Sequence, residues 1–237
     1  DGTLSVTTRA ANDNSTVSYP VELFVFSDSK CCAIQEISSA SDNVRISSQP
    51  GEYNVYAIGG ISNYNIPDKE SISKFTLLSF KNGKTKHGNL MVAQSNVLLE
   101  AGKSTSLDLK LKRKVMMLNE VKLQNIPITA KEVRVSLSPL YNTICIDGSY
   151  GGGDTTYEVE LDKQADGTTW SASPKTYLLP ETDKTAQIII TITFSNGMSK
   201  SYLHKSTEPL KENSHVNIVA TYEALKTTLI VNIQGEE

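Results

Sequence analysis

Apolar and polar residues alternate with a period of two along most of the chain, a pattern typical of β-strands with one buried face. In the N-terminal half the alternation is clearest at residues 107–112, whereas residues 21–26 and 53–58 are apolar at nearly every position. The first pattern predicts a half-buried strand, and the other two predict strands buried on both faces. The same period of two continues through residues 133–137, 157–161, 188–192 and 229–233.

Short turns separate these segments. Asn-Gly or Asp-Gly pairs occur at residues 82–83, 147–148, 166–167 and 196–197, and such pairs tolerate the positive φ that tight turns require. The last pair predicts a hairpin between residues 187–195 and 198–204. Two short helices are predicted at residues 68–73 and 208–211 from their capping residues. Because strands dominate and helices do not alternate with them, we expect an all-β fold of sandwiches rather than a parallel α/β sheet.

The chain length favours one large domain or two of ordinary size, since domains commonly hold about 100 to 200 residues. A basic strand at residues 107–114 gives way to the apolar run at 115–118, where a new set of strands begins. We therefore predict an N-terminal β-sandwich at 1–114 and a C-terminal one at 115–237. Each half then has about seven strands, the usual number for a small Greek-key sandwich.

Composition and charge exclude several classes of protein. A net charge of −3 is too weak to indicate a nucleic-acid partner, so none is expected. Uninterrupted apolar runs are far shorter than the roughly 18 residues of a membrane span, so no transmembrane segment is predicted. The adjacent Cys31 and Cys32 can bridge only through a strained ring, and Cys145 lies in an apolar run typical of a buried thiol. The sequence encodes no disulfide framework.

Motifs that could support catalysis or bind a cofactor are incomplete. Gly83-Lys84-Thr85 and Gly102-Lys103-Ser104 resemble the end of a phosphate-binding loop but lack its earlier glycine. His87, His204 and His215 have no partner at metal-ligand spacing. Residues 162–167 imitate the start of a calcium loop, but Ser173 stands where the closing glutamate is required. No GxSxG elbow is present. We therefore predict a protein that is not an enzyme, with no catalytic, cofactor-binding or metal residues and no cofactor.

Trp170 is the single tryptophan, and it has two interpretations. Together with Tyr150, Tyr157 and Tyr177 it could form an aromatic platform that stacks on sugars, as expected for a surface lipoprotein that binds glycans. Packing in a hydrophobic core is the favoured alternative.

A family resemblance rests on the order and spacing of several segments. The segments are the strand at 19–26 with its turn at Ser27-Asp28, PGEYNVYAIGG at 50–60, LKLKR at 109–113, IDGSYG at 146–151 and YLLP at 177–180. In order and spacing they resemble the fimbrillin-associated anchor and tip proteins of the type V pili made by Bacteroidales.

The resemblance implies two transthyretin-like sandwiches in tandem and a structural or adhesion role without catalysis. The chain is then an accessory, tip or anchor subunit of a cell-surface fimbria, assembled by strand-mediated contacts. Its partners are other fimbrial subunits and, as a further option, ligands on host or bacterial surfaces. The resemblance also implies export to the outer membrane through a lipoprotein signal. Cys31 and Cys32 lie too deep in the first domain to carry the lipid, so we expect the anchor upstream of Asp1.

In polymerising relatives an arginine-directed protease removes the first strand and opens a groove for a donor strand from another subunit. Arg9 follows the strand-like residues 4–8 and precedes the loop-like residues 10–15, so it is a candidate processing site; an incidental exposed arginine is the alternative. The apolar alternation of Leu229, Val231 and Ile233 suits a donor strand, and equally the last strand of its own domain.

Overall fold

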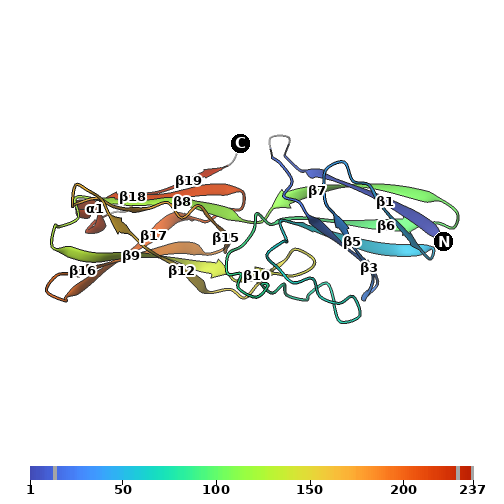
Figure 1. The fold of residues 1–237 in the computed structure, drawn as a ribbon, viewed down its shortest axis with the longest axis horizontal. Coiled ribbons are helices and arrows are strands. Elements are labelled where there is room, and N and C mark those ends of the chain that lie inside the picture. The colour runs from blue at the N-terminus through green and yellow to red at the C-terminus, as the bar shows by residue number, and fades with distance from the viewer. Residues whose placement is uncertain (13–14, 228–229, 236–237) are drawn as a thin grey trace. The chain divides into compact units, whose positions relative to one another are not determined.

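The computed structural model describes residues 1–12, 15–227 and 230–235, and its regular structure there is β-strand apart from one short helix. This confirms the all-β sandwich fold. The chain divides into two compact units (Figure 1). The N-terminal unit comprises Asp1–Lys114 and Thr143–Gly151, and the C-terminal unit comprises Val115–Asn142 and Gly152–Glu237. The predicted limits at 114 and 115 assign residues 143–151 to the second half, whereas contacts place them in the first. That each unit is an independent domain stays a prediction.

The main sheet of the N-terminal unit has seven strands in the hydrogen-bonded order β3-β2-β5-β6-β7-β1-β4. The first and last strands of this sheet along the chain, β1 and β7, lie side by side and run parallel. Their bounds are β1 Gly2–Ala10, β2 Val21–Ser27, β3 Lys30–Ile37, β4 Val44–Ser48, β5 Gly51–Gly59, β6 Met91–Leu99 and β7 Ser104–Arg113.

Two layers enclose the core of this unit. Strands β4, β1 and β7 form one layer, strands β3, β2, β5 and β6 form the other, and the end of β7 joins them. Alternate side chains of both layers, such as Leu4, Val6, Leu23, Val55 and Leu109, are at most 2% exposed and pack together. Burying each contributes about 1.5 to 3 kcal/mol. The period of two seen in the sequence is therefore the alternation of core and outer faces.

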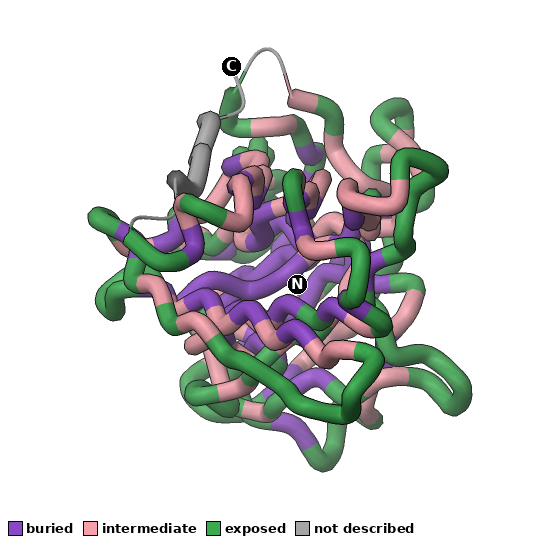
Figure 2. Tube along the Cα trace, turned by 90° about the vertical axis from the view of Figure 1, so that its left-hand side faces the viewer, coloured by how far each residue is buried: buried purple, intermediate pink, exposed green. Residues whose placement is uncertain are grey.

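The C-terminal unit is a second sandwich. Strands β12, β9, β16 and β17 form one sheet in that order, and β8 lies between β18 and the pair β14 and β15 in the other. The bounds are β8 Met116–Gln124, β9 Ala130–Tyr141, β12 Thr155–Glu160, β13 Asp162–Lys163, β14 Trp170–Ala172, β15 Thr176–Pro180, β16 Thr185–Phe194, β17 Ser199–Pro209, β18 Ser214–Thr221, α1 Tyr222–Leu225 and β19 Ile230–Gly235. Buried segments lie in the interior and exposed loops around them in Figure 2.

Local predictions had mixed outcomes. The hairpin is confirmed: β16 and β17 pair antiparallel, and Gly197 takes a φ of 83° at its tip. Both predicted helices are wrong. Residues 68–73 form turns, in which the Asp68 carbonyl accepts a hydrogen bond from the Ser71 amide, and residues 208 and 209 end strand β17 because Pro209 pairs with Thr185. The helix that does form, α1, is capped by the Thr221 side chain.

Strands β5 and β6 are joined by residues 60–90, here called the long connection. Connections of this length without regular structure are uncommon in compact domains and are often functional. Residues 21–26 are all buried, which confirms the prediction that β2 is covered on both faces. Val21, Leu23 and Val25 face the sandwich core, whereas Phe24 and Phe26 point to the opposite face and are also at most 1% exposed.

Candidate functional site

The long connection has internal order. The Asn65 amide donates to the Ser79 carbonyl at 2.9 Å, and the Lys81 amide donates to the Asn63 carbonyl at 2.9 Å. Between these bonds Tyr64 and Phe80 form an antiparallel bridge. Backbone hydrogen bonds of this kind hold the two arms of the connection together, so the connection presents a defined surface rather than a random coil.

Three aromatic rings anchor the connection. Tyr64 is fully buried, and its ring lies 4.9 Å from that of Phe80 and 6.1 Å from that of His87, between centroids. Burial lowers the pKa of His87 to about 4 and raises the pKa of Tyr64. At neutral pH the imidazole is therefore uncharged, and the Tyr64 hydroxyl and His87 Nδ1 form a hydrogen bond. This pair is a structural lock, because the two uncharged groups are hydrogen-bonded to each other across the connection.

Residues 143–151, although far along the chain, pack beside the long connection in the same unit. This segment contains β10 (Thr143–Ile144) and β11 (Tyr150–Gly151), which pair antiparallel. The Leu78 amide donates to the Ile144 carbonyl at 2.9 Å, and the Thr143 hydroxyl donates to the Leu78 carbonyl at 2.7 Å. Leu77 and Cys145 form a further bridge. The connection and a chain segment from far along the sequence thus form one layer.

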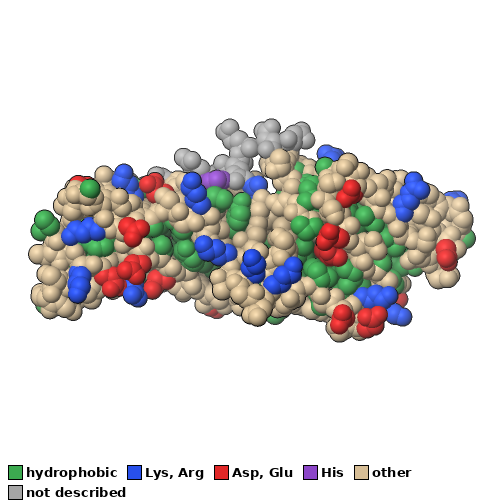
Figure 3. Space-filling view, in the orientation of Figure 1, with side chains coloured by type: hydrophobic (Ala, Val, Ile, Leu, Met, Phe, Trp, Pro, Cys, Tyr) green, Lys and Arg blue, Asp and Glu red, His purple; other side chains and the backbone are tan. Residues whose placement is uncertain are grey.

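This layer exposes apolar and basic side chains. Phe75 is 64% exposed, Leu77 52% and Ile66 38%, and the Lys74 ammonium lies 4.9 Å from the centre of the Phe75 ring. Three further exposed lysines, 81, 84 and 86, follow within the connection. Figure 3 shows a separate group of hydrophobic side chains on the same unit, over the strands that Figure 1 labels β3 and β5. Exposed apolar residues on an ordered loop are typical of a surface that binds another molecule.

A cavity of about 640 Å³ lies where the long connection meets the turn between β2 and β3. Lys30, Cys32, Lys69, Glu70 and Ile72 are among its lining residues. Cys31 also lines the cavity, and burial raises the pKa of its thiol, so this thiol is not activated as a nucleophile. The cavity offers polar contacts from Lys30, Lys69 and Glu70.

A buried carboxylate belongs to the C-terminal unit. Glu181 is 2% exposed and accepts a hydrogen bond from the Asp154 amide at 2.6 Å, and the Lys184 ammonium lies 2.8 Å from its Oε2. Lys184 also contacts the Asp154 carboxylate at 2.7 Å. All these groups have partners, so the cluster ties two turns together and is not poised for acid-base catalysis. Within the described residues, no group of His, Cys, Asp or Glu side chains is placed to hold a metal ion.

Arg9 lies near the end of strand β1, not in a loop. Its backbone is within the parallel ladder with β7, opposite Lys110, and its Nε lies 2.7 Å from Oδ2 of Asp108. The side chain is about half exposed, and the loop begins two residues later, at Ala11. Processing after Arg9 stays a prediction: its side chain is half exposed, and its backbone is held in the ladder with β7.

Trp170 does not form a surface platform. It is 4% exposed, packs in the core of the C-terminal unit, and pairs with Leu123 across β14 and β8. Tyr157 packs against the same core, while Tyr150 belongs to the N-terminal unit and donates its hydroxyl to the Lys114 carbonyl at 2.6 Å. The sugar-stacking interpretation of Trp170 is wrong, because β14 directs the indole inward.

At the C-terminus, β19 pairs antiparallel with β18, from Ile230 opposite Val219 to Gly235 opposite Ser214. Of the two interpretations of this segment, the structure therefore shows the one in which it forms the last strand of its own unit. Leu229, part of the predicted pattern, lies outside the described residues.

Neither the exposed surface of the long connection nor the Tyr64–His87 pair that locks it was predicted from the sequence. A signal was available: residues 60–90 separate two strongly β segments yet have no sustained period of two, and they contain five lysines. Their contact with residues 143–151 has no local signal, because it depends on the tertiary fold.

No helix in the described residues has the length and hydropathy of a membrane span. No curated protein matches the chain as a sequence relative.

Solved structures share the fold over nearly the whole chain. A candidate polysaccharide-binding protein from Bacteroides thetaiotaomicron matches with a TM-score of 0.63 at 14% identity, covering 100% of this chain and 99% of that one. A candidate adhesin from the same species has a TM-score of 0.62 at 8% identity, covering 98% and 96%. The tip fimbrial protein Mfa3 from Porphyromonas gingivalis has a TM-score of 0.51 at 13% identity, covering 99% of each chain.

The family model of the fimbrillin-A associated anchor proteins Mfa1 and Mfa2 matches residues 1–235. The chain therefore belongs to this family of structural fimbrial and adhesion proteins.

Proposed function

We propose that the chain is an accessory, tip or anchor subunit of a cell-surface fimbria, and that it works by binding rather than by catalysis. The single observation that supports this most strongly is the family match over residues 1–235. In the N-terminal unit, Tyr64 and His87 are hydrogen-bonded to each other, and burial raises the pKa of the Cys31 thiol. The subunit attaches to the outer membrane through a lipid carried upstream of Asp1.

The two units act as tandem sandwich domains, each with its own core. The long connection is the recognition surface of the first domain, because it exposes Phe75 and Leu77 on an ordered scaffold beside several lysines. Its ligand is another fimbrial subunit or a molecule on a host or bacterial surface. Anchoring such residues in a folded layer limits the entropy lost on binding.

Assembly by strand exchange fits the position of β1. This strand lies between β7 and β4, and Leu4 and Val6 fill the core with no exposed surface. Cleavage after Arg9 and release of β1 leave a groove with unpaired backbone on both sides and apolar sockets at alternate positions. A donor strand with alternating apolar residues satisfies both needs. The C-terminal segment has that alternation, although in this structure β19 pairs within its own chain.

The test is a strain that lacks this subunit, complemented with defined variants and examined by electron microscopy and by binding to partner cells. An anchor is expected to leave fimbriae in the medium when it is missing, and a tip or accessory subunit is expected to leave attached fimbriae that bind poorly. Phe75→Ser with Leu77→Ser tests the recognition surface, and Leu98→Ser is the matched control, since Leu98 is 55% exposed on β6. Unchanged fimbriae and unchanged binding in the deletion strain would contradict the proposal.

A further inference from the structure

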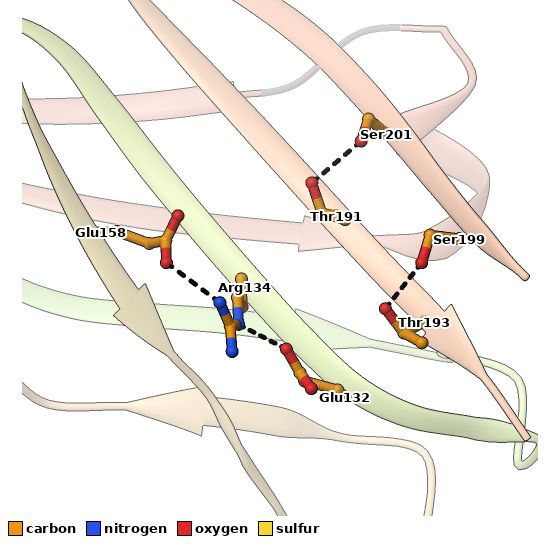
Figure 4. Close-up of polar contacts among 7 residues, drawn as sticks. All are labelled: Glu132, Arg134, Glu158, Thr191, Thr193, Ser199 and Ser201. Carbon is orange, nitrogen blue, oxygen red and sulfur yellow. Dashed lines mark hydrogen bonds and ion pairs between the residues drawn. The ribbon is translucent and has the colours of Figure 1, made fainter. Parts of the chain in front are cut away.

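The sheet formed by β12, β9, β16 and β17 has two open edges. Among the residues that the structure describes, strand β12 pairs only with β9, and strand β17 pairs only with β16. Figure 4 shows this sheet, with Glu158 on β12 at one side and Ser199 and Ser201 on β17 at the other. An open edge presents unpaired backbone N–H and C=O groups that can pair with a further strand.

The two edges carry opposite charges. Strand β12 contains Glu158 and Glu160 and no basic residue, and both side chains are exposed. From Ser199 to Thr207, strand β17 contains Lys200 and Lys205 and no acidic residue, and both lysines are exposed. In the described part of the chain no ion pair involves either lysine. Pairing two β12 edges or two β17 edges would bring like charges together, whereas pairing β12 with β17 brings opposite charges together.

The directions of the two edges also match. Strand β12 is antiparallel to β9, β9 to β16 and β16 to β17, so β12 and β17 run antiparallel within their sheet. A second copy placed beside the first in the same orientation, apart from the sheet twist, therefore presents its β12 to the first copy's β17 in the antiparallel sense. Each of these strands already pairs in the antiparallel direction with its neighbour in its own sheet.

The register allows a specific charge pair. On the face of the sheet that points away from the core, residues that pair across neighbouring strands form rows. One row holds Glu158, Ser136, Ile189 and Leu203. Lys205, which pairs with Gln187, lies two residues further along β17, in the next row. A stagger of two residues between copies therefore sets Lys205 opposite Glu158 and Leu203 opposite Glu160. Leu203 is 56% exposed in the single chain, and a paired strand would cover part of it.

The β17 edge is held in place by its own sheet. The hydroxyls of Thr191 and Ser201 lie 2.9 Å apart, and those of Thr193 and Ser199 lie 2.8 Å apart (Figure 4). On the other side, Glu158 lies 3.4 Å from the Arg134 guanidinium, which also pairs with Glu132. These contacts order both edges before association, which reduces the entropy cost of pairing.

We propose that the β17 edge of one copy of this chain pairs with the β12 edge of a second copy, in a head-to-tail contact that extends the sheet. Because the contact joins two different surfaces, each dimer keeps one free edge of each kind, and longer assemblies can form. The proposal goes beyond the strand exchange described above, since it uses the intact chain and needs neither cleavage after Arg9 nor donation of the C-terminal segment.

The test is sedimentation velocity of the intact chain over a wide range of concentrations. We expect reversible association that weakens as salt is added. Lys205→Glu and Glu158→Lys should each weaken it about tenfold, because an attractive cross-strand pair becomes a repulsive one. An equimolar mixture of the two variants should restore association, since the wild-type and the reversed charge pairs are then both available between unlike copies.

Two controls separate this contact from others. Lys110→Glu makes the same change of charge on β7 and should leave association unchanged, and so should Arg9→Ala. A chain that stays monomeric at every concentration overturns the edge contact and leaves the fimbrial role standing. Association that ignores both edge variants, or a mixture that fails to restore it, overturns the edge contact as well.

Discussion

Glu22 provides a sharp test of the physical description of the N-terminal unit. This carboxylate lies on β2 among side chains that are almost all apolar, is 7% exposed, and stands opposite Glu36 of β3 across an antiparallel pair. Burial, and secondarily the charge of Glu36, raise the pKa of Glu22 to about 7. The proposed change is Glu22→Gln, which removes the charge and keeps the shape.

The size of the effect follows from the pKa. Relative to an ordinary value of 4.5, a folded pKa of about 7 means that ionised Glu22 destabilises the fold by roughly 3 kcal/mol above pH 7. The buried amide of glutamine has its own desolvation cost of about 1 kcal/mol, so we expect a net gain of about 2 kcal/mol.

The sign depends on pH. Well below pH 4.5 the carboxyl is protonated in both folded and unfolded chains. Its charge then contributes nothing to the difference in free energy of unfolding between the variant and the wild type. As pH rises from there to about 7, the wild type loses stability because the folded chain retains the proton that the unfolded chain releases. The advantage of Glu22→Gln therefore grows over this window and is constant above it.

The assay must report on the N-terminal unit. Fluorescence of Trp170, the single tryptophan, reports on the C-terminal unit, so hydrogen exchange of the β2 and β5 amides under native conditions is the better measure. Glu36→Gln is the matched control and should give a smaller gain, because charge repulsion is the lesser cause of the shift. A Glu22→Gln gain that is independent of pH, or larger at pH 5 than at pH 8, would refute the reasoning.

Three further predictions follow from buried or paired side chains. Trp170→Ala should cost about 3 to 5 kcal/mol in denaturant unfolding, because it empties a core site, while leaving the binding of any surface ligand by the folded fraction unchanged. Tyr64→Phe should cost about 1 to 3 kcal/mol by amide exchange of the long connection, because it removes the hydroxyl that is hydrogen-bonded to Nδ1 of the half-buried His87. Arg9→Ala should cost less than about 1 kcal/mol in unfolding, since its ion pair with Asp108 is exposed, yet block cutting by an arginine-specific protease, as mass spectrometry of the products would show.

Strand positions were predictable because the chemistry that sets them is local. The alternation at residues 188–192 is the alternation of core and outer side chains in β16, and Asn196-Gly197 forms the hairpin tip that its composition predicts. The nearly continuous apolar segment at 21–26, interrupted only by Glu22, correctly indicated burial on both faces, although the sequence did not show what covers the second face.

Features set by tertiary contact were not predictable. Residues 143–151 read as part of the second half, but their backbone bonds with Leu78 place them in the N-terminal unit. The core position of Trp170 was the favoured prediction and is confirmed, but its pairing with β8 has no local signal, and the raised pKa of Glu22 likewise depends on a strand pair. The opposite charges of β12 and β17 are visible in the sequence, but only the sheet order shows that these two strands form its edges.

The most direct test of the central claim is mass spectrometry of fimbriae sheared from the native cell surface, with the N-terminus of this chain mapped in the same sample. The account predicts that the chain is present in the fimbriae together with other subunits. A start at Ala10 would indicate processing after Arg9, and a lipidated, longer N-terminus would indicate an anchor. A chain that the cells produce but that is absent from their fimbriae would contradict the account.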